Sequence, residues 1–450
     1  MAGPGTTHHY ELQDVPEPNL LRDVFPYDTV PKIVFDGVSE ECDPAPQFYI
    51  TDTTFRDGQQ ARPPYTVQQI VDLYTLLHRL GGPQGIIRQA EFFLYSDVDR
   101  AAVRRCLALG YTFPEVTGWI RAVKSDFALV EEMGLKETGI LTSCSDYHIF
   151  LKLKKSRRQA FDEYLGVVKD ALDAGIRIRC HLEDATRADF YGFVVPFVTE
   201  LMRLREESGI PIKVRVCDTM GFGVPFANAA LPRSVPKLIQ GLRRECGVPS
   251  ECLEWHGHND FHKVLVNAST AWLYGCMYAN GTLLGYGERT GNPPLEALVM
   301  EYISLTGDPS GMDTTVIREI AEYFEQEINY HIPANYPFVG RDFNVTRAGI
   351  HADGPLKDEE IYNIFDTTKV LGRPPRVAVD KTSGTAGVAW WINTYFNLPS
   401  KQRVDKKASS VLQITDWVDG QYRLGRTTSI SDEEMVQQVR RHAPTLVSTD

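Results

Sequence analysis

The sequence lacks the features of several protein classes. No apolar run reaches the roughly 18 residues that a membrane-spanning helix needs, and the N-terminus lacks the basic and apolar stretches of a signal peptide. The eight cysteines show no C-x-x-C spacing, which favours reduced thiols in a cytoplasmic protein. Acidic residues (59) exceed basic ones (47), and the formal charge of −12 disfavours nucleic acid as a partner. We therefore expect a cytoplasmic protein that binds neither membranes nor nucleic acids.

After residue 45 the sequence alternates short β-rich runs with helical runs, for example Val67–Leu80 and Arg158–Ala174. This rhythm favours βα units around a parallel sheet. Eight such strands fit a closed barrel better than an open sheet. The expected fold is therefore α/β, a TIM (β/α)8 barrel. The strand candidates are Gln47–Thr53, Gln89–Phe93, Glu115–Gly118, Thr138–Thr142, Arg177–Leu182, Lys213–Cys217, Leu253–His258 and Gly281–Leu284.

The same patterns divide the chain into four parts. Residues 1–45, rich in Pro, Asp and Glu, form an expected N-terminal arm, and residues 46–308 form the barrel. The βα rhythm then stops. A predicted helix and a Pro-rich stretch make residues 309–370 a linker subdomain that carries His351 and Tyr362. Residues 371–450 are predicted to form a small α-rich subdomain.

Two distant segments together suggest a divalent-metal site. Asp57 follows Arg56 in the first segment, and His256 and His258 are spaced i, i+2 in the second. Residues at this spacing point to one face of a β-strand, so both imidazoles could bind one ion, with the carboxylate as the anionic ligand. Polar residues at strand ends can also be helix caps, as Asp218 could be, but capping does not require His-x-His.

Four motifs resemble those of a known superfamily. "DTTFRDGQQ", "HGHND", "GYGERTGNPPLE" and "AGIHADGPLK" occur in the order found in the DRE-TIM metallolyases. Over residues 48–370 the chain is similar to the Claisen-condensing branch, which contains isopropylmalate, citramalate, homocitrate and Re-face citrate synthases. The resemblance implies a TIM barrel followed by smaller subdomains. It also implies acetyl-CoA and a 2-oxo acid as substrates, a divalent metal, and a homodimer.

The resemblance also assigns roles to individual residues. It places the metal on Asp57, His256, His258 and Asn292. It makes Arg56, Glu183, His351 and Tyr362 catalytic, and it matches a substrate-binding glutamine to Gln60 or, less well, to Gln59. Substrate-binding candidates at the ends of the fifth and sixth strands are Arg179, His181 and Thr219. Manganese is favoured, although Mg²⁺, Co²⁺ and Zn²⁺ suit similar ligands.

These residues suit a Claisen condensation. A metal can polarise the ketone, and Arg56 can stabilise the developing alkoxide. His351 and Glu183 are the candidates for proton movement. Alternatives stay open, because His351 could be structural and Glu183 could pair with Arg187. The basic run that starts at Lys152 could attract CoA phosphates, although a solvated helix start is favoured.

Arg179 and His181 bear on which 2-oxo acid is used. A buried arginine needs an anionic partner, and the second carboxylate of a dicarboxylic acid could supply one. Homocitrate synthases resemble the chain in having arginine at position 179, but they have a small serine at position 181. The larger imidazole shortens the pocket and adds a donor, which favours oxaloacetate over 2-oxoglutarate. Pairing of Arg179 with Glu183 or Asp184 is the structural alternative.

We therefore expect citrate formation from acetyl-CoA and oxaloacetate, with homocitrate synthesis as the runner-up and citramalate or isopropylmalate synthesis more distant. Two other classes remain. Hydroxymethylglutaryl-CoA-type lyases have a cysteine in the glycine-rich loop, whereas Gly285–Asn292 contains none. A non-enzymatic metal-binding relative is disfavoured because the motif residues that the resemblance makes catalytic or metal-binding are retained.

Overall fold

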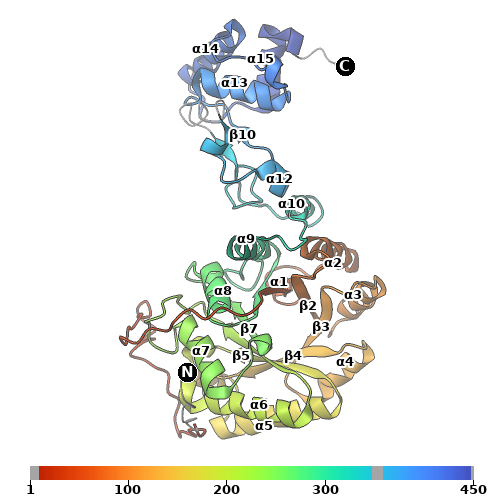
Figure 1. Ribbon diagram of the computed structural model, residues 1–450, viewed down its shortest axis with the longest axis vertical. Coiled ribbons are helices and arrows are strands. Elements are labelled where there is room, and N and C mark those ends of the chain that lie inside the picture. The colour runs from red at the N-terminus through yellow and green to blue at the C-terminus, as the bar shows by residue number, and fades with distance from the viewer. Residues whose placement is uncertain (1–9, 347–357, 447–450) are drawn as a thin grey trace. The chain divides into compact units, whose positions relative to one another are not determined.

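The computed structural model describes residues 10–346 and 358–446 (Figure 1). The chain divides into two compact units, Met1–Asp313 and Thr314–Asp450. Each unit is treated by itself below. Among the described residues, no helix is both long and apolar enough to cross a bilayer.

The first unit contains a closed barrel of eight parallel strands, as the sequence predicts. Closure occurs between the first and last strands, where Tyr49 pairs with Tyr278 and Asp52 with Gly281. All eight carboxyl ends therefore open at one end of the barrel. The strands are β1 (Tyr49–Asp52), β2 (Ile87–Phe93), β3 (Glu115–Ile120), β4 (Glu137–Ser143), β5 (Arg177–Glu183), β6 (Ile212–Asp218), β7 (Leu253–Gly257) and β8 (Tyr278–Gly281).

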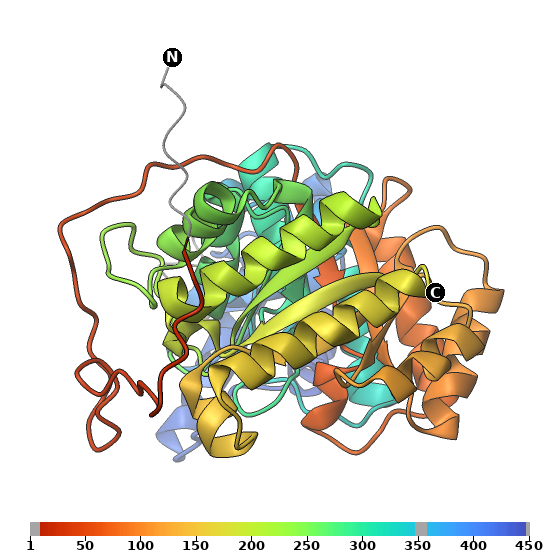
Figure 2. The same ribbon diagram turned by 90° about the horizontal axis from the view of Figure 1, so that it is seen from below.

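Helices surround the strands, and Figure 2 shows two of them, α5 and α6, side by side outside the barrel. Local sequence sets where several begin. Thr66, Ser96 and Ser156 each form a capping box at the start of a helix, which satisfies backbone N–H groups that have no partner within the helix. The helices are α2 (Val67–Gly81), α3 (Asp97–Ala108), α4 (Phe127–Glu132), α5 (Arg157–Asp173), α6 (Val195–Ser208), α7 (Val235–Cys246), α8 (Val264–Leu273) and α9 (Leu295–Thr306).

The prediction for the eighth strand is wrong in position. The strand ends at Gly281, where the predicted strand was to begin. The apolar pair Leu283–Leu284 instead lies in a 3-10 turn, with Leu284 at a positive φ of 56°. The Leu283 N–H donates to Thr54 Oγ1 (2.9 Å), so a side chain takes up a backbone donor of this turn. Apolar character alone could not distinguish the buried turn from a strand.

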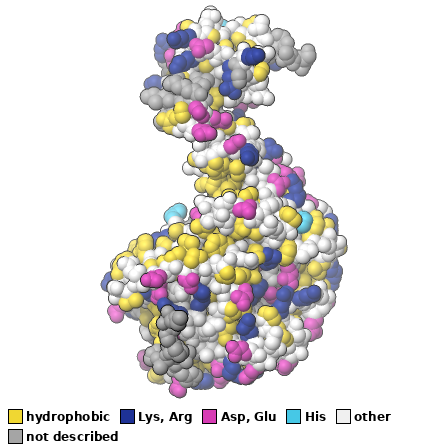
Figure 3. Space-filling view, in the orientation of Figure 1, with side chains coloured by type: hydrophobic (Ala, Val, Ile, Leu, Met, Phe, Trp, Pro, Cys, Tyr) yellow, Lys and Arg dark blue, Asp and Glu magenta, His cyan; other side chains and the backbone are white. Residues whose placement is uncertain are grey.

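Residues 10–46 form an arm without helices, which runs over the outside of the barrel unit (Figure 1). Ion pairs and backbone contacts fasten it: Lys237 contacts Asp36 (2.5 Å) and Arg157 donates to the Gln13 carbonyl (3.0 Å). On the face of the barrel unit seen in Figure 3, basic and acidic side chains are interspersed.

The second unit is rich in α-helix. Its core packs buried side chains from α13, α14 and α15, among them Trp390, Val411 and Met435. A short parallel pair, β9 (Val345–Thr346) and β10 (Arg376–Val377), lies in the same unit. The expected boundary at residue 370 stays a prediction. The helices are α10 (Val316–Gln326), α12 (Thr367–Leu371), α13 (Gly384–Tyr395), α14 (Ser409–Arg423) and α15 (Asp432–His442).

Candidate active site

The carboxyl ends of the barrel strands surround a cavity of about 240 Å³. Barrel enzymes build their active sites at this end, because the loops after the strands converge there. Eight of the residues predicted from sequence line the cavity. They are Arg56, Asp57, Gln60, His181, Glu183, Thr219, His256 and His258.

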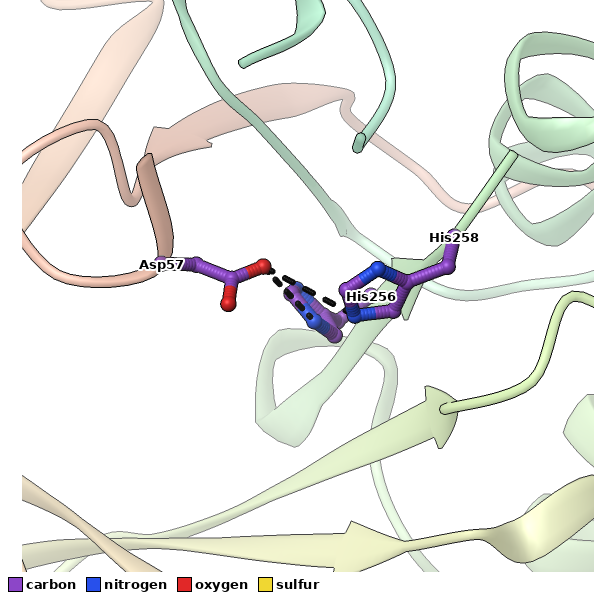
Figure 4. A group of neighbouring side chains, drawn as sticks. All are labelled: Asp57, His256 and His258. Carbon is purple, nitrogen blue, oxygen red and sulfur yellow. Dashed lines mark ion pairs between the residues drawn. The ribbon is translucent and has the colours of Figure 1, made fainter. Parts of the chain in front are cut away.

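Asp57, His256 and His258 converge in this cavity, as Figure 4 shows. Asp57 begins the short helix α1 (Asp57–Gln60) just after β1, His256 lies on β7, and His258 follows that strand. Asp57 Oδ2 lies 3.8 Å from His256 Nε2 and 3.7 Å from His258 Nε2. All three ligand atoms lie within 4.8 Å of one another, and all three residues are buried. The predicted grouping of these residues is present in the fold.

The donor atoms of this group fit a divalent cation. His256 Nδ1 lies 2.7 Å from Asn280 Oδ1, so Nδ1 carries the proton and Nε2 keeps its lone pair toward Asp57. Burial lowers the pKa of His256 and of His258, which keeps both rings neutral. Asp57 Oδ2 has no hydrogen-bond partner among the described residues, although it is buried. An unpaired buried carboxylate oxygen facing two neutral imidazoles is the arrangement that a metal ion satisfies.

Asn292, the fourth predicted ligand, offers a further oxygen. Its amide nitrogen donates to the Gly257 carbonyl (3.0 Å), whereas its Oδ1 is buried without a hydrogen-bond partner among the described residues. Burial would raise the pKa of Asp57, but the Arg56 charge, the two histidines and Asn292 together outweigh burial and lower it. A side chain at Gly287 would collide with Asn292 Oδ1, so glycine is needed there. The role of Asn292 as a ligand stays a prediction.

Arg56 is held beside the metal group by several partners. Its guanidinium lies 3.3 Å from Asp57 Oδ1 and 3.3 Å from Glu91 Oε2. It also stacks over the Trp119 ring at 5.1 Å. Only 8% of the residue is exposed. A planar cation fixed in this way can direct N–H groups at an oxygen bound to a neighbouring metal.

The surroundings of Glu183 favour its ionised form. Burial would raise the pKa of Glu183, but hydrogen bonds from His148 and Ser143 and the charge of Lys152 outweigh it and lower the pKa to about 2. Lys152 Nζ lies 3.1 Å from Glu183 Oε1. The alternative pairing with Arg187 is wrong, because Arg187 pairs with Asp184 at 2.9 Å.

The lowered pKa of Glu183 predicts that a Glu183→Gln variant differs from wild type in how its stability depends on pH. The unfolded carboxyl titrates near its ordinary value of 4.5, so its stabilising contribution is present above that pH and is lost as the pH falls toward 2. As the pH falls from about 5.5 to about 3.5, the free energy of unfolding of wild type should decrease by roughly 1 kcal/mol more than that of the variant. Denaturant unfolding at several pH values measures this difference. A difference that does not change with pH would contradict the lowered pKa.

Arg179 does not occupy the predicted place in the cavity wall. It is fully buried in the barrel interior, where it pairs with Glu91 (2.7 Å), Glu137 (3.3 Å) and Glu254 (3.3 Å). The expectation that Arg179 lacks an anionic partner without substrate is therefore wrong, and so is the alternative pairing with Glu183 or Asp184. Three carboxylates from other strands already compensate the guanidinium.

The remaining predicted residues divide between the two units. Gln60 lines the cavity, whereas the Gln59 side chain bonds the backbone of Phe55 and Tyr65, so the geometry selects Gln60. Thr219 lines the cavity, and its hydroxyl accepts a hydrogen bond from the Asp184 N–H (2.8 Å). Tyr362 belongs to the second unit and is half exposed. His351 lies outside the described residues.

Several site residues were not anticipated. Asn280 orients His256, but the predicted eighth strand begins at Gly281 and so does not include it. His148 and Lys152, which contact Glu183, lie on a π-helical turn, η2 (Tyr147–Lys152), after β4. Lys152 lines the cavity, so this end of the basic run is not simply a solvated helix start. Such turns are frequent at functional sites, but no sequence period reveals them.

The family model described as HMGL-like matches residues 47–324, which span the barrel. The chain belongs to the HMGL-like family. This membership confirms the resemblance to the DRE-TIM metallolyases.

Three relatives are similar over almost the whole chain. Citrate (Re)-synthase of Syntrophus aciditrophicus is 61% identical over 98% of this chain and 70% of its own length. Citrate (Re)-synthase of Clostridium kluyveri is 57% identical over 98% of this chain and 97% of its own. The 2-phosphinomethylmalate synthase of Streptomyces hygroscopicus is 37% identical over 96% of this chain and 98% of its own.

A solved structure supports the fold alone. Hydroxymethylglutaryl-CoA lyase from Pseudomonas aeruginosa superposes with a TM-score of 0.51 at 18% identity, covering 64% of this chain and 95% of its own. Identity this low carries no argument about the reaction.

Proposed function

We propose that this protein is a metal-dependent acyltransferase that condenses acetyl-CoA with oxaloacetate to give citrate and CoA. The observation that carries the proposal is the buried group of Asp57, His256 and His258, with the Arg56 guanidinium beside it in the barrel-end cavity. The two near-full-length relatives named citrate (Re)-synthase supply the choice of reaction within the family.

The cavity residues suit the binding and activation of a 2-oxo acid. Asp57, His256, His258 and Asn292 would hold the cation, manganese in our proposal, which supplies Lewis-acid polarisation of the ketone when bound. Arg56 donates hydrogen bonds to the ketone oxygen as negative charge develops there. Burial of these groups excludes water, which strengthens both interactions.

Paired charges lie beneath the cavity and in its wall. Beneath it, Arg179, Arg215 and Lys213 pair with Glu91, Glu137 and Glu254. In the wall, Arg56 pairs with Asp57, and Lys152 pairs with Glu183. Because Arg56 and Lys152 line the cavity, we propose them as the cations that meet an anionic substrate.

The second half of the reaction requires proton removal from the acetyl methyl group. We propose His351 for this step, with Glu183 and Tyr362 as further catalytic groups. We also propose a homodimer in the cytoplasm. All eight cysteines are free thiols, as is usual for proteins of a reducing compartment.

A thiol-release assay tests the proposal. Purified protein with Mn²⁺ and acetyl-CoA is supplied separately with oxaloacetate, 2-oxoglutarate, pyruvate and 2-oxoisovalerate. We expect CoA release to be fastest with oxaloacetate and the product to be citrate by mass spectrometry. A preference for 2-oxoglutarate would assign homocitrate synthesis instead. No CoA release with any of the four acids would overturn the proposed function.

A further inference from the structure

Glu91 on β2 contacts two cavity residues but does not itself line the cavity. Its carboxylate is 1% exposed. It lies 3.3 Å from His181 Nε2 and 3.3 Å from Arg56 Nε, and both of those residues line the cavity. Arg179 (2.7 Å) and Arg215 (3.0 Å) approach it from below. One buried carboxylate thus connects the barrel interior with two side chains that face the substrate.

These contacts fix the direction of the His181 ring. Arg56 Nη2 lies 3.4 Å from His181 Nδ1, and an arginine can only donate, so Nδ1 is an acceptor. On the other side of the ring, Glu91 Oε1 lies 3.3 Å from Nε2, and Arg179 Nε donates to the same nitrogen at 3.5 Å, the limit of hydrogen-bond distance. Burial, followed by the charge of Arg215, holds the pKa of His181 well below its usual range, which agrees with a neutral ring.

Gly139 on β4 provides a second, independent observation on the same ring. A Cβ atom at this position would lie 2.5 Å from His181 Nε2 and 3.1 Å from Glu91 Oε1. The first distance is shorter than real Cβ contacts allow, so any side chain at position 139 would displace the imidazole. The glycine is therefore needed for space, and the space it leaves is filled by the His181 ring and the Glu91 carboxylate.

We propose that Glu91 and Gly139 are positioning residues that hold the His181 ring as a wall of the cavity, and that this wall limits the carbon chain of the 2-oxo acid that the enzyme accepts. The inference deepens and rests on the proposed function. Both ring nitrogens have partners within the protein, so the ring contributes bulk to the wall. This corrects the expectation that His181 offers the substrate an additional donor.

Glu91→Gln tests the carboxylate, with Glu137→Gln as the matched control. Both carboxylates are 1% exposed and both pair with Arg179, but Glu137 contacts neither His181 nor Arg56 in this structure. The amide that Glu91→Gln introduces would have to turn its N–H₂ group toward a donor on one side or the other. Hydrogen bonds to charged groups contribute enough that we expect a ten- to hundredfold fall in kcat/KM for oxaloacetate.

The readout that separates positioning from general destabilisation is a ratio. We expect Glu91→Gln to lower the ratio of kcat/KM for oxaloacetate to kcat/KM for 2-oxoglutarate by about tenfold or more, while Glu137→Gln leaves it within about twofold. Mn²⁺ affinity, measured by electron paramagnetic resonance, should be unchanged in both. An equal change of the ratio in the two variants would overturn the role of Glu91.

Gly139→Ala gives a second test that does not depend on the folding of Glu91→Gln. Crowding of the ring should lower kcat/KM for oxaloacetate about ten- to hundredfold in the wild-type background. The same substitution should have little effect in a His181→Ser background, where no ring is present to be displaced. An equal loss in both backgrounds would overturn the inference. Absence of CoA release by wild type with every oxo acid would instead overturn the proposed function.

Discussion

His258→Ala is expected to lower the rate of CoA release by a factor on the order of 10³ or more. The reason is that a metal ion in such sites supplies several kcal/mol of transition-state stabilisation, and each 1.4 kcal/mol corresponds to about tenfold in rate. His258 is one of three buried groups whose ligand atoms lie within 4.8 Å of one another. Alanine would leave the Asp57 carboxylate with a single imidazole partner. Initial rates with saturating Mn²⁺, together with Mn²⁺ binding by isothermal titration calorimetry, measure the effect.

The matched control is His262→Asn. His262 lies four residues further along the same loop, is exposed, and has a positive φ of 54°, a conformation that asparagine tolerates. Its replacement should leave both rate and Mn²⁺ affinity near wild type. If His258→Ala bound Mn²⁺ as tightly as wild type, the assignment of the metal ligands would be wrong.

Asn280→Ala should reduce Mn²⁺ affinity by an amount between the effects of His258→Ala and His262→Asn. Its Oδ1 accepts a hydrogen bond from His256 Nδ1 and thereby selects the tautomer that directs Nε2 at the site. Loss of such a partner typically weakens metal binding about 10- to 100-fold. The same titration calorimetry measures this change, and unaltered Mn²⁺ affinity would show that the tautomer is set by another group.

The barrel and its metal group could be predicted from sequence because each depends on a local pattern. The βα rhythm predicts the number of strands, and all eight pair in order around the barrel. His256 and His258 are two residues apart, and they lie at and just after the end of β7, so the local chain brings them together. Asp57 joins them because the ends of β1 and β7 open at the same end of a closed barrel.

The partners of Arg179 could not be predicted in this way. Glu91, Glu137 and Glu254 lie on three different strands. In the sequence, each is only a single polar residue within or next to a predicted strand, with nothing to link it to Arg179. Only the closed barrel brings the three carboxylates around the guanidinium. The partners of Arg179 therefore depend on which strands are neighbours in the closed barrel, and the spacing of residues in the sequence does not reveal them.

The predicted position of the eighth strand is wrong for a related reason. Leu283 and Leu284 are buried and apolar, as strand residues would be, yet they form a turn whose backbone is held by Thr54 from the other end of the barrel sequence. That hydrogen bond joins residues 229 positions apart. No window of local sequence contains this hydrogen bond. Sequence patterns therefore predict the strand too far along the chain, and the predicted strand leaves out Asn280.

Arg56→Lys is expected to lower kcat by about 10² to 10³ while metal binding stays within a few-fold of wild type, the size of loss found when one oxyanion-stabilising donor is removed. The substitution keeps the positive charge but removes the planar fork. In the structure the guanidinium contacts Asp57 and Glu91 at 3.3 Å and lies 3.4 Å from His181 Nδ1. A lysine ammonium has three donors on a flexible stem and cannot keep these contacts and also face the substrate oxygen.

Two comparisons separate this role of Arg56 from simple charge balance. Arg56→Gln, which removes the charge as well, should have a lower kcat than Arg56→Lys. The difference in kcat between the two variants reports how much the charge alone contributes to the rate. Arg289→Lys is the control at the cavity loop, because Arg289 pairs with Asp260 (2.9 Å) and contacts neither Asp57 nor Glu91. If Arg56→Lys retained the wild-type kcat with oxaloacetate, stabilisation of the alkoxide would require only a nearby positive charge. The fixed guanidinium that Glu91, Trp119 and Asp57 hold in place would then serve the fold of the barrel mouth rather than the reaction.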